Sequence, residues 1–262
     1  MSALPKTATS GLACRQLTVE VAGRSLVRDL ELAVAGGTVT AILGCNGAGK
    51  TLTMHTLAGL RAPARGGVTL DGELLTTWPR RELARRLGLL TQTTEDPFPS
   101  TVLDSVLVGR HPHIDFWHWE SDADRAIART ALAAVALADL AEREVDTLSG
   151  GERRRVAFAT LLAQDPEEFL LDDPINHLDP HHQLDVLKLL REKAHAGRTV
   201  VMSLHDAGLA ARFSDHALLL FGNGEWLSGP TAEVLTPATM TRLYGVAVRE
   251  IAWNGGRTFV AE

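Results

Sequence analysis

The chain has 262 residues, of which 45% are hydrophobic, and a formal net charge of −6. This length supplies a core for one large domain or two small ones. The acidic balance argues against a general nucleic-acid surface, because no domain-wide excess of lysine and arginine is present to neutralise phosphates. The two cysteines, Cys14 and Cys45, exclude a disulfide framework and favour a reducing compartment. The sequence contains no run of 18 apolar residues, so it predicts no membrane-spanning helix. Its first ten residues lack the apolar core of a signal peptide.

Strands and helices alternate over the first third of the chain. Apolar alternation predicts the strands, an Asp-Gly pair predicts a tight turn, and Pro79 is typical of a helix start. In chain order the expected elements are a strand from Leu12 to Val21, a second strand ending at Val34, a buried strand from Val39 to Leu43, a helix from Thr51 to Leu57 closing at Gly59, a hairpin within Val68 to Leu74, a helix from Arg80 to Arg86 and a strand from Leu87 to Thr91.

From Thr93 to about Gln164 the pattern is helical with few strand signals. Ser121, followed by an acid at the third helical position, predicts the start of a helix that runs to about Val135. Alternation then resumes, which predicts an α/β fold with a mainly parallel sheet covered on both faces. The later elements are a strand from Phe169 to Leu171, a helix from Pro180 to about His195, a strand from Thr199 to Ser203 and a hairpin around Gly222-Asn223-Gly224.

The strand from Val39 to Leu43 leads into a phosphate-binding loop of the form G-x-x-x-x-G-K-T. Its residues are Gly44, Cys45, Asn46, Gly47, Ala48, Gly49, Lys50 and Thr51. The glycines allow successive backbone N–H groups to face one concavity, and the following helix adds its partial positive charge. We expect Lys50 to reach the β- and γ-phosphates and the Thr51 hydroxyl to ligate Mg²⁺. The sequence therefore predicts binding of a nucleoside triphosphate.

Further motifs follow in a fixed order. They are Gln92 at the end of a strand, Leu148-Ser149-Gly150-Gly151-Glu152 before a helix, the strand from Phe169 that ends in Asp172, the segment Asn176-His177-Leu178-Asp179, and His205 after a buried strand. Together with the phosphate-binding loop, this series resembles the ATP-binding subunits of ABC transporters. The resemblance covers nearly the whole chain.

The resemblance implies a P-loop NTPase cassette: an α/β fold with a mixed sheet core, an antiparallel β edge and an inserted helical subdomain. It implies one domain over residues 1–262. Residues 1–92 and 165–262 would form a RecA-like core with its β subdomain, and residues 93–164 would form the helical subdomain that carries the signature.

The resemblance also implies the role of each motif. The signature residues Ser149, Gly150, Gly151 and Glu152 would bind the γ-phosphate of an ATP held by a second copy, so two chains would pair head to tail. Asp172, with Thr51 and Gln92, would hold Mg²⁺. His205 would contact the γ-phosphate and the attacking water, and Asp179 would organise the dimer interface. Taken singly, Ser149 could be a helix cap, Asp172 a buried carboxylate without metal, His205 a structural residue and Asp179 the cap of the next helix.

Three positions depart from the family pattern. The residue after Asp172 is usually glutamate, which positions the attacking water, but here it is Asp173, shorter by one methylene. Such a displacement can cost on the order of 10²-fold in rate, so a regulatory module that closes on ATP with little turnover is the alternative. Where an aromatic residue usually stacks on adenine, the aligned segment offers Val21. Arg154 replaces a common glutamine, which we take as a smaller change.

The C-terminal half is similar to importers of iron-siderophores, haem and cobalamin, for example over Asn176 to Leu187 and Leu204 to Arg212. That likeness implies a membrane permease, a substrate-binding protein that feeds it, and a position at the cytoplasmic face of the inner membrane.

The segment from His111 to Glu120 holds three histidines and three aromatics, but their spacing matches no zinc template. We interpret it as an exposed docking patch. A soluble ATPase acting on DNA or ribosomes is disfavoured, because no second phosphate-binding loop or heptad pattern occurs.

Overall fold

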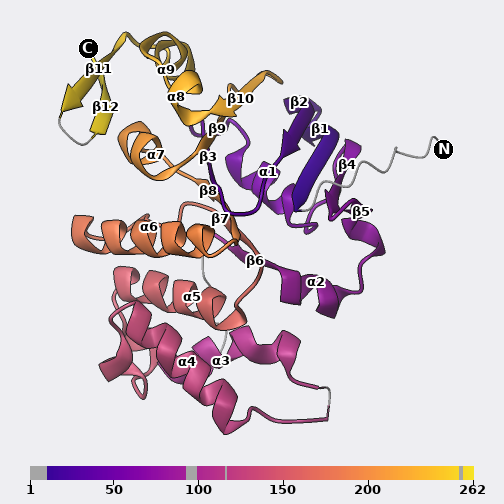
Figure 1. Ribbon diagram of the computed structural model, residues 1–262, viewed down its shortest axis with the longest axis vertical. Helices are drawn as coiled ribbons and strands as arrows, with labels where there is room; N and C mark the ends of the chain where they lie inside the picture. The colour runs from indigo at the N-terminus through magenta and orange to yellow at the C-terminus, as the bar shows by residue number, and fades with distance from the viewer. Residues whose placement is uncertain (1–10, 93–98, 116, 254–255) are drawn as a thin grey trace. The chain divides into compact units, whose positions relative to one another are not determined.

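The computed structural model describes residues 11–92, 99–115, 117–253 and 256–262. The chain forms two compact units (Figure 1). The first comprises the residues up to Trp78 together with those from Leu190 onward, and the second comprises Pro79 to Leu189. Each unit is described separately below.

In the first unit, the central sheet is built on β3 (Val39–Leu43). It pairs in parallel with β8 (Thr199–Ser203) on one side and β9 (His216–Leu220) on the other, and β10 (Trp226–Pro230) runs antiparallel to β9. Every residue of β3 and β8 is buried, as continuous apolar runs predict. The register aligns Ile42 with Ser203, so the segments that follow β3 and β8 leave the sheet at the same edge.

The first unit also contains an antiparallel sheet in the order β2-β1-β4-β5. Its strands are β1 (Leu12–Val21), β2 (Arg24–Ala33), β4 (Arg65–Leu70) and β5 (Glu73–Leu74). The predicted Asp-Gly turn is confirmed, because Asp71 and Gly72 both have positive φ (52° and 81°) and join two paired strands. At the β1 irregularity, a Cβ on Gly66 would lie 2.3 Å from the Arg15 carbonyl oxygen, so only glycine fits there.

In this unit α1 (Lys50–Leu57) follows β3 and α7 (Ala207–Phe213) follows β8, both strands of the central sheet. The short 3-10 helix η1 (Leu75–Thr77) follows β5 of the antiparallel sheet. Gly59 follows α1 with φ 70°, the left-handed conformation predicted for its helix end. The C-terminal segment was not predicted. It contains α8 (Thr231–Val234), α9 (Pro237–Tyr244) and the hairpin of β11 (Val248–Trp253) with β12 (Gly256–Ala261), coloured yellow in Figure 1.

The second unit contains two parallel strands and most of the helices. The strands are β6 (Leu87–Leu90) and β7 (Glu168–Leu171). The helical elements are α2 (Arg80–Arg86), α3 (Val102–Leu107), η2 (Val108–His113), α4 (Asp122–Ala134), η3 (Ala138–Leu140), η4 (Val145–Thr147) and α5 (Gly150–Gln164). Helix α6 (Pro180–His195) begins here, and the chain re-enters the first unit within it.

The core of the second unit is formed where α3, α4 and α5 pack against one another. Ser121 and Asp124 form the predicted capping box at the start of α4. Gly109 permits a close approach, since a Cβ there would lie 2.2 Å from the Thr160 carbonyl oxygen on α5. Among the described residues, no helix is both long and apolar enough to cross a bilayer.

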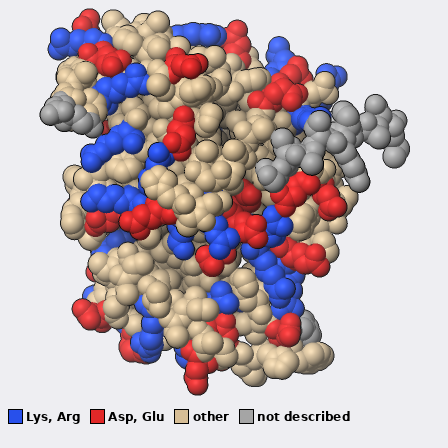
Figure 2. Space-filling model, in the orientation of Figure 1, with Lys and Arg blue, Asp and Glu red and all other residues tan. Residues whose placement is uncertain are grey.

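The α/β fold with a mixed sheet, an antiparallel β edge and a helical insertion is confirmed. The compact units divide near residues 78 and 189, whereas the predicted subdomains divide at 92 and 164. The difference arises because α2, β6 and β7 belong to the same compact unit as the helices α3, α4 and α5. The predicted subdomains, as functional divisions, stay a prediction. On the face drawn in Figure 2, basic and acidic side chains are intermixed.

Candidate functional site

The backbone of the loop between β3 and α1 requires its glycines. Gly47 and Gly49 adopt positive φ (79° and 102°), and a Cβ on Gly44 would lie 2.7 Å from the Leu220 carbonyl oxygen. Gly49 precedes α1 without a side-chain cap, and the first turn of α1 contains no acidic residue. The N-terminal end of α1 therefore keeps its partial positive charge available to an anion.

Lys50 is buried, and its ammonium group lies inside the loop. Its Nζ donates to the carbonyl oxygen of Gly44 at 2.6 Å and lies 3.4 Å from that of Cys45. The side chain thus bridges the start of the loop and the start of the helix, where a point charge can meet a phosphate. Thr51 follows in the first turn of α1 and is half-buried.

His205 lies at the same edge of the central sheet, directly after β8. The Leu204 N–H donates to the Ile42 carbonyl at 3.0 Å, which extends the pairing with β3 to the residue before His205. His205 is exposed, and Asp206 after it caps α7 by accepting from the Leu209 N–H at 2.8 Å. The structure therefore brings His205 to the edge at which the phosphate-binding loop begins.

The C-terminal helix α9 reaches both of these segments, which the sequence did not indicate. The Cys45 thiol donates to the Leu243 carbonyl at 3.1 Å, and the Tyr244 hydroxyl donates to the His205 carbonyl at 3.5 Å. Burial raises the pKa of Tyr244, and the neighbouring Cys45 and Asp206 act in the same direction. Thr236 and Thr239 form the capping box that starts α9, which marks the helix but not its contacts.

In the second unit, Asp172 and Asp173 follow β7 and are both buried. The Asp172 N–H donates to the Leu90 carbonyl at 2.8 Å, so the β6–β7 pairing extends one residue beyond β7. Asp173 has φ 54°, a left-handed conformation that aspartate tolerates better than most residues. Gln92, after β6, is exposed.

Arg154 joins these segments through four backbone carbonyls. One terminal nitrogen donates to Thr91 at 2.5 Å and to Gln92 at 3.3 Å, and the other donates to Asp172 at 2.6 Å and Asp173 at 2.8 Å. The residue is 5% exposed. Burial lowers its pKa, and the carboxylates of Asp173 and Asp172 oppose that shift by favouring the charged form. Arg154 therefore fixes the backbone at Gln92 and Asp173, two of the three predicted catalytic residues, which is more than the small change the sequence suggested.

A helical pattern on α5 could have revealed Arg154. It lies three and four residues before Ala157 and Phe158, and seven before Leu161, all of which are buried. An arginine on the apolar face of a helix needs buried acceptors.

The signature residues form a closed capping box at the start of α5. The Glu152 N–H donates to the Ser149 hydroxyl at 3.3 Å, and Glu152 Oε2 accepts from the Ser149 N–H at 2.8 Å and the Ser149 hydroxyl at 2.7 Å. The two bonds that the Glu152 carboxylate accepts, led by the one from the Ser149 backbone, lower the pKa of Glu152. Ser149 and Gly150 are exposed, and Gly151 is half-buried.

Two further predicted residues lie on the surface. Val21 ends β1 and is exposed, so base stacking at this position stays a prediction. Asp179 is exposed before α6, and its carbonyl accepts from the Gln183 N–H at 2.9 Å. Its role at a dimer interface also stays a prediction.

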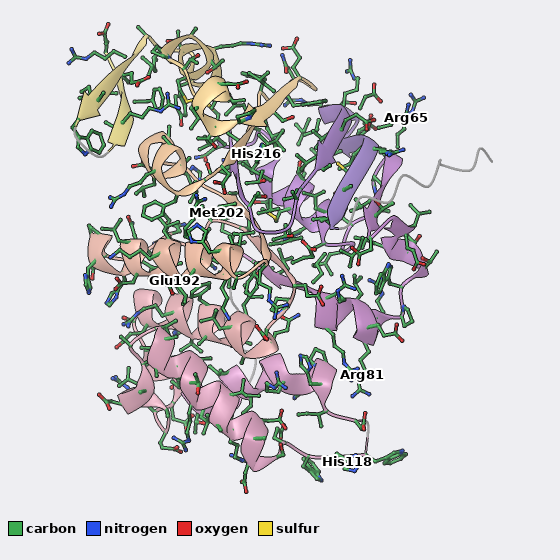
Figure 3. The ribbon with its side chains drawn as sticks, in the orientation of Figure 1. Arg65, Arg81, His118, Glu192, Met202 and His216 are labelled. Atoms are coloured by element: carbon green, nitrogen blue, oxygen red, sulfur yellow. The ribbon has the colours of Figure 1, made fainter. Side chains whose placement is uncertain are left out.

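The segment 111–120 presents the indoles of Trp117 and Trp119, which are 87% and 89% exposed. Figure 3 shows His118 on this segment, and Phe116 lies outside the described residues. Arg81 of α2 donates to the Pro112 carbonyl at 3.0 Å and also to the Ile114 carbonyl, which anchors the segment. Within the described part of the chain, the histidines of this segment belong to no group of three or more potential metal ligands.

A glycine-rich loop with a buried lysine, set between a buried strand and an uncapped helix, defines a nucleoside-triphosphate-binding protein of the P-loop class. Residues 27–176 match the ABC transporter family, and the chain belongs to that family as an ATP-binding ATPase.

Two curated relatives align over most of their length. The hemin import ATP-binding protein HmuV of Nocardia farcinica is 42% identical over 89% of this chain and 82% of its own. The ferric enterobactin transport ATP-binding protein FepC of Escherichia coli is 38% identical over 88% of this chain and 86% of its own.

Two solved structures are also similar. An inward-facing metal-chelate type ABC transporter matches with a TM-score of 0.84 at 27% identity, covering 97% of this chain and 98% of that chain. The cassette MJ0796, solved as a dimer with ADP and Pi, matches with a TM-score of 0.73 at 25% identity, covering 84% of this chain and 98% of that chain.

Proposed function

We propose that this chain hydrolyses ATP to drive import of a metal-chelate nutrient, a siderophore, haem or cobalamin complex, through a membrane permease. The observation that carries the proposal is the phosphate-binding loop with its buried Lys50, in a chain 38–42% identical to proteins named for hemin import and ferric enterobactin transport. These names favour an iron or haem chelate over cobalamin.

Individual residues have the following proposed roles. Lys50 and the loop N–H groups hold the phosphates, and Gln92, Asp173 and His205 position the attacking water around the γ-phosphate. The Thr51 hydroxyl and the Asp172 carboxylate are hard oxygen donors of the kind Mg²⁺ prefers, and both residues sit at ends of regular elements that fix them. Bound Mg²⁺ would neutralise phosphate charge.

The proposed assembly is a head-to-tail homodimer bound to permease subunits at the cytoplasmic face of the inner membrane. The dimer reported for MJ0796 supports pairing, and the exposed signature at Ser149 and Gly150 leaves that surface accessible. A substrate-binding protein would deliver the chelate to the permease from the other side. The exposed Trp117 and Trp119 are proposed to dock onto the permease.

The test is Mg-ATP hydrolysis and chelate uptake by the purified subunit reconstituted with its permease. Wild type is compared with Lys50→Ala, Asp173→Asn and Asp173→Glu. Asparagine keeps the shape of aspartate and removes its charge. Glutamate extends the carboxylate by one methylene at a position where the backbone has positive φ. We expect turnover in wild type that is lost in Lys50→Ala and reduced at least about tenfold in Asp173→Asn.

The alternative, an ATP-gated module with little turnover, predicts a different outcome. Wild type would bind ATP and stay silent with the permease present, while Asp173→Glu would hydrolyse. The names of the relatives do not support this alternative.

A double Trp117→Ala, Trp119→Ala variant should bind ATP normally and lose coupled uptake, and unchanged uptake would contradict the docking role.

A further inference from the structure

The first two turns of α6 bring together two imidazoles and a carboxylate. His181 Nε2 lies 3.4 Å from Asp185 Oδ2, and His182 Nδ1 lies 3.9 Å from the same oxygen. The potential ligand atoms of the three residues all lie within 4.8 Å of one another, the one such group among the described residues. His181 and Asp185 are exposed and His182 is half-buried, so solvent reaches the group.

The helix itself fixes this arrangement. His181 and Asp185 are four residues apart and His182 and Asp185 are three apart, the two spacings that place side chains on one helix face. Buried Val186, Leu187 and Leu190 anchor the same helix. The backbone positions are therefore set before any ligand binds, and side-chain rotation is the main adjustment left.

The two imidazole-to-carboxylate distances fit one shared metal ion. Zinc binds imidazole nitrogen and carboxylate oxygen at about 2.0–2.2 Å with tetrahedral angles, which separates two ligand atoms by about 3.3–3.5 Å. The 3.4 Å pair already has this spacing, and the 3.9 Å pair is a few tenths of an ångström wider.

An ion pair alone explains the cluster less well. The His182 to Asp185 separation of 3.9 Å is too long for a hydrogen bond, and exposed charge pairs add about 0–1 kcal/mol at most. Two nitrogen donors converging on one carboxylate oxygen form a mixed donor set. Such a set suits Zn²⁺, Ni²⁺ or Cu²⁺, whereas Mg²⁺ and Ca²⁺ prefer oxygen donors alone.

We propose that His181, His182 and Asp185 form a surface site for a divalent transition-metal ion of the zinc class. Three protein ligands leave a fourth position of the tetrahedron open to water or to a group from another molecule. The site is separate from the oxygen donors proposed for Mg²⁺, and it does not depend on the proposed transport function.

The test uses the full chain without a histidine tag, stripped of metal and free of nucleotide. Isothermal titration with ZnCl₂ should show about one ion per chain, and MgCl₂ should give no comparable binding at this group. Losing a partner that only orients a ligand costs on the order of 10–100-fold in affinity. We therefore expect His181→Ala and Asp185→Asn to weaken zinc binding at least about tenfold.

His195→Ala is the matched control, since His195 is exposed at the far end of α6 and outside the group. It should leave zinc affinity unchanged. Co²⁺ gives a second readout, because its visible absorption reports tetrahedral coordination and should disappear in His182→Ala. The proposal is overturned if wild type takes up no zinc, or if the three ligand variants bind it as tightly as wild type does.

Discussion

Replacing Arg154 by methionine keeps an unbranched side chain but removes all four hydrogen bonds to the carbonyls of Thr91, Gln92, Asp172 and Asp173. Three of these bonds are 2.8 Å or shorter, and a bond from a charged donor contributes about 1.5 kcal/mol or more. The gross loss is therefore about 4–5 kcal/mol. Removing a buried charge recovers part of it, so we expect a net loss of about 2–3 kcal/mol.

For a chain of this size, 1 kcal/mol lowers the melting temperature by about 2–4 °C, so the Arg154→Met protein should melt about 5–10 °C lower. The melting temperature of Arg154→Gln should lie between those of wild type and Arg154→Met, because one amide nitrogen can donate to at most two of the four carbonyls. Because the backbone that carries Asp173 is released, kcat for ATP should fall more than KM rises.

Thermal unfolding and steady-state ATP hydrolysis measure both effects. Arg129→Met is the matched control, since Arg129 on α4 makes an exposed ion pair with Glu142 and should cost less than about 1 kcal/mol. The reasoning is refuted if Arg154→Met melts and turns over like Arg129→Met.

Three further outcomes follow from the site and its surroundings. N-ethylmaleimide should modify the exposed Cys45 and block ATP binding, and it should have no effect on ATP binding by the Cys45→Ser variant. It should spare Cys14, which is buried and whose pKa is raised by burial to about 12. Mass spectrometry measures the modification, and a fluorescent nucleotide measures the binding. Val21→Tyr should tighten ATP binding by roughly 1–3 kcal/mol through base stacking, and equal affinity in a nucleotide titration would contradict it. Hydrogen bonds led by that of Ser121 lower the pKa of Asp124 to about 2, so its stabilising contribution is present above about pH 4 and lost as pH falls toward 2; urea titrations of Asp124→Asn should show a flatter acid limb.

Most of the features that the sequence predicted depend on residues that are close together in the chain. The phosphate-binding loop, the Asp71-Gly72 turn and the capping box at Ser121 each depend on residues within a few positions, and each formed as expected. Strand β3 was equally readable, because a strand buried on both faces is mostly apolar, and Thr40 is its one polar residue.

The unpredicted features depend on residues far apart in the chain. Arg154 contacts a carbonyl 63 residues away, and the Cys45 thiol contacts one 198 residues away. No periodicity encodes such pairings. The hairpin of β11 and β12 was missed for another reason: it is largely exposed, so its strands carry little of the apolar alternation that marks a half-buried strand.

The capping box at Ser149 means that Glu152 already occupies the positive end of α5 with its own negative charge. In the proposed dimer, the γ-phosphate of a partner's ATP would compete with this carboxylate for the same serine hydroxyl and backbone N–H groups. On this proposal, Glu152 satisfies the start of α5 while the subunit is alone, and it would have to move aside rather than bind the phosphate itself. A single free anion would therefore bind weakly at this helix end, because it must first displace the Glu152 carboxylate.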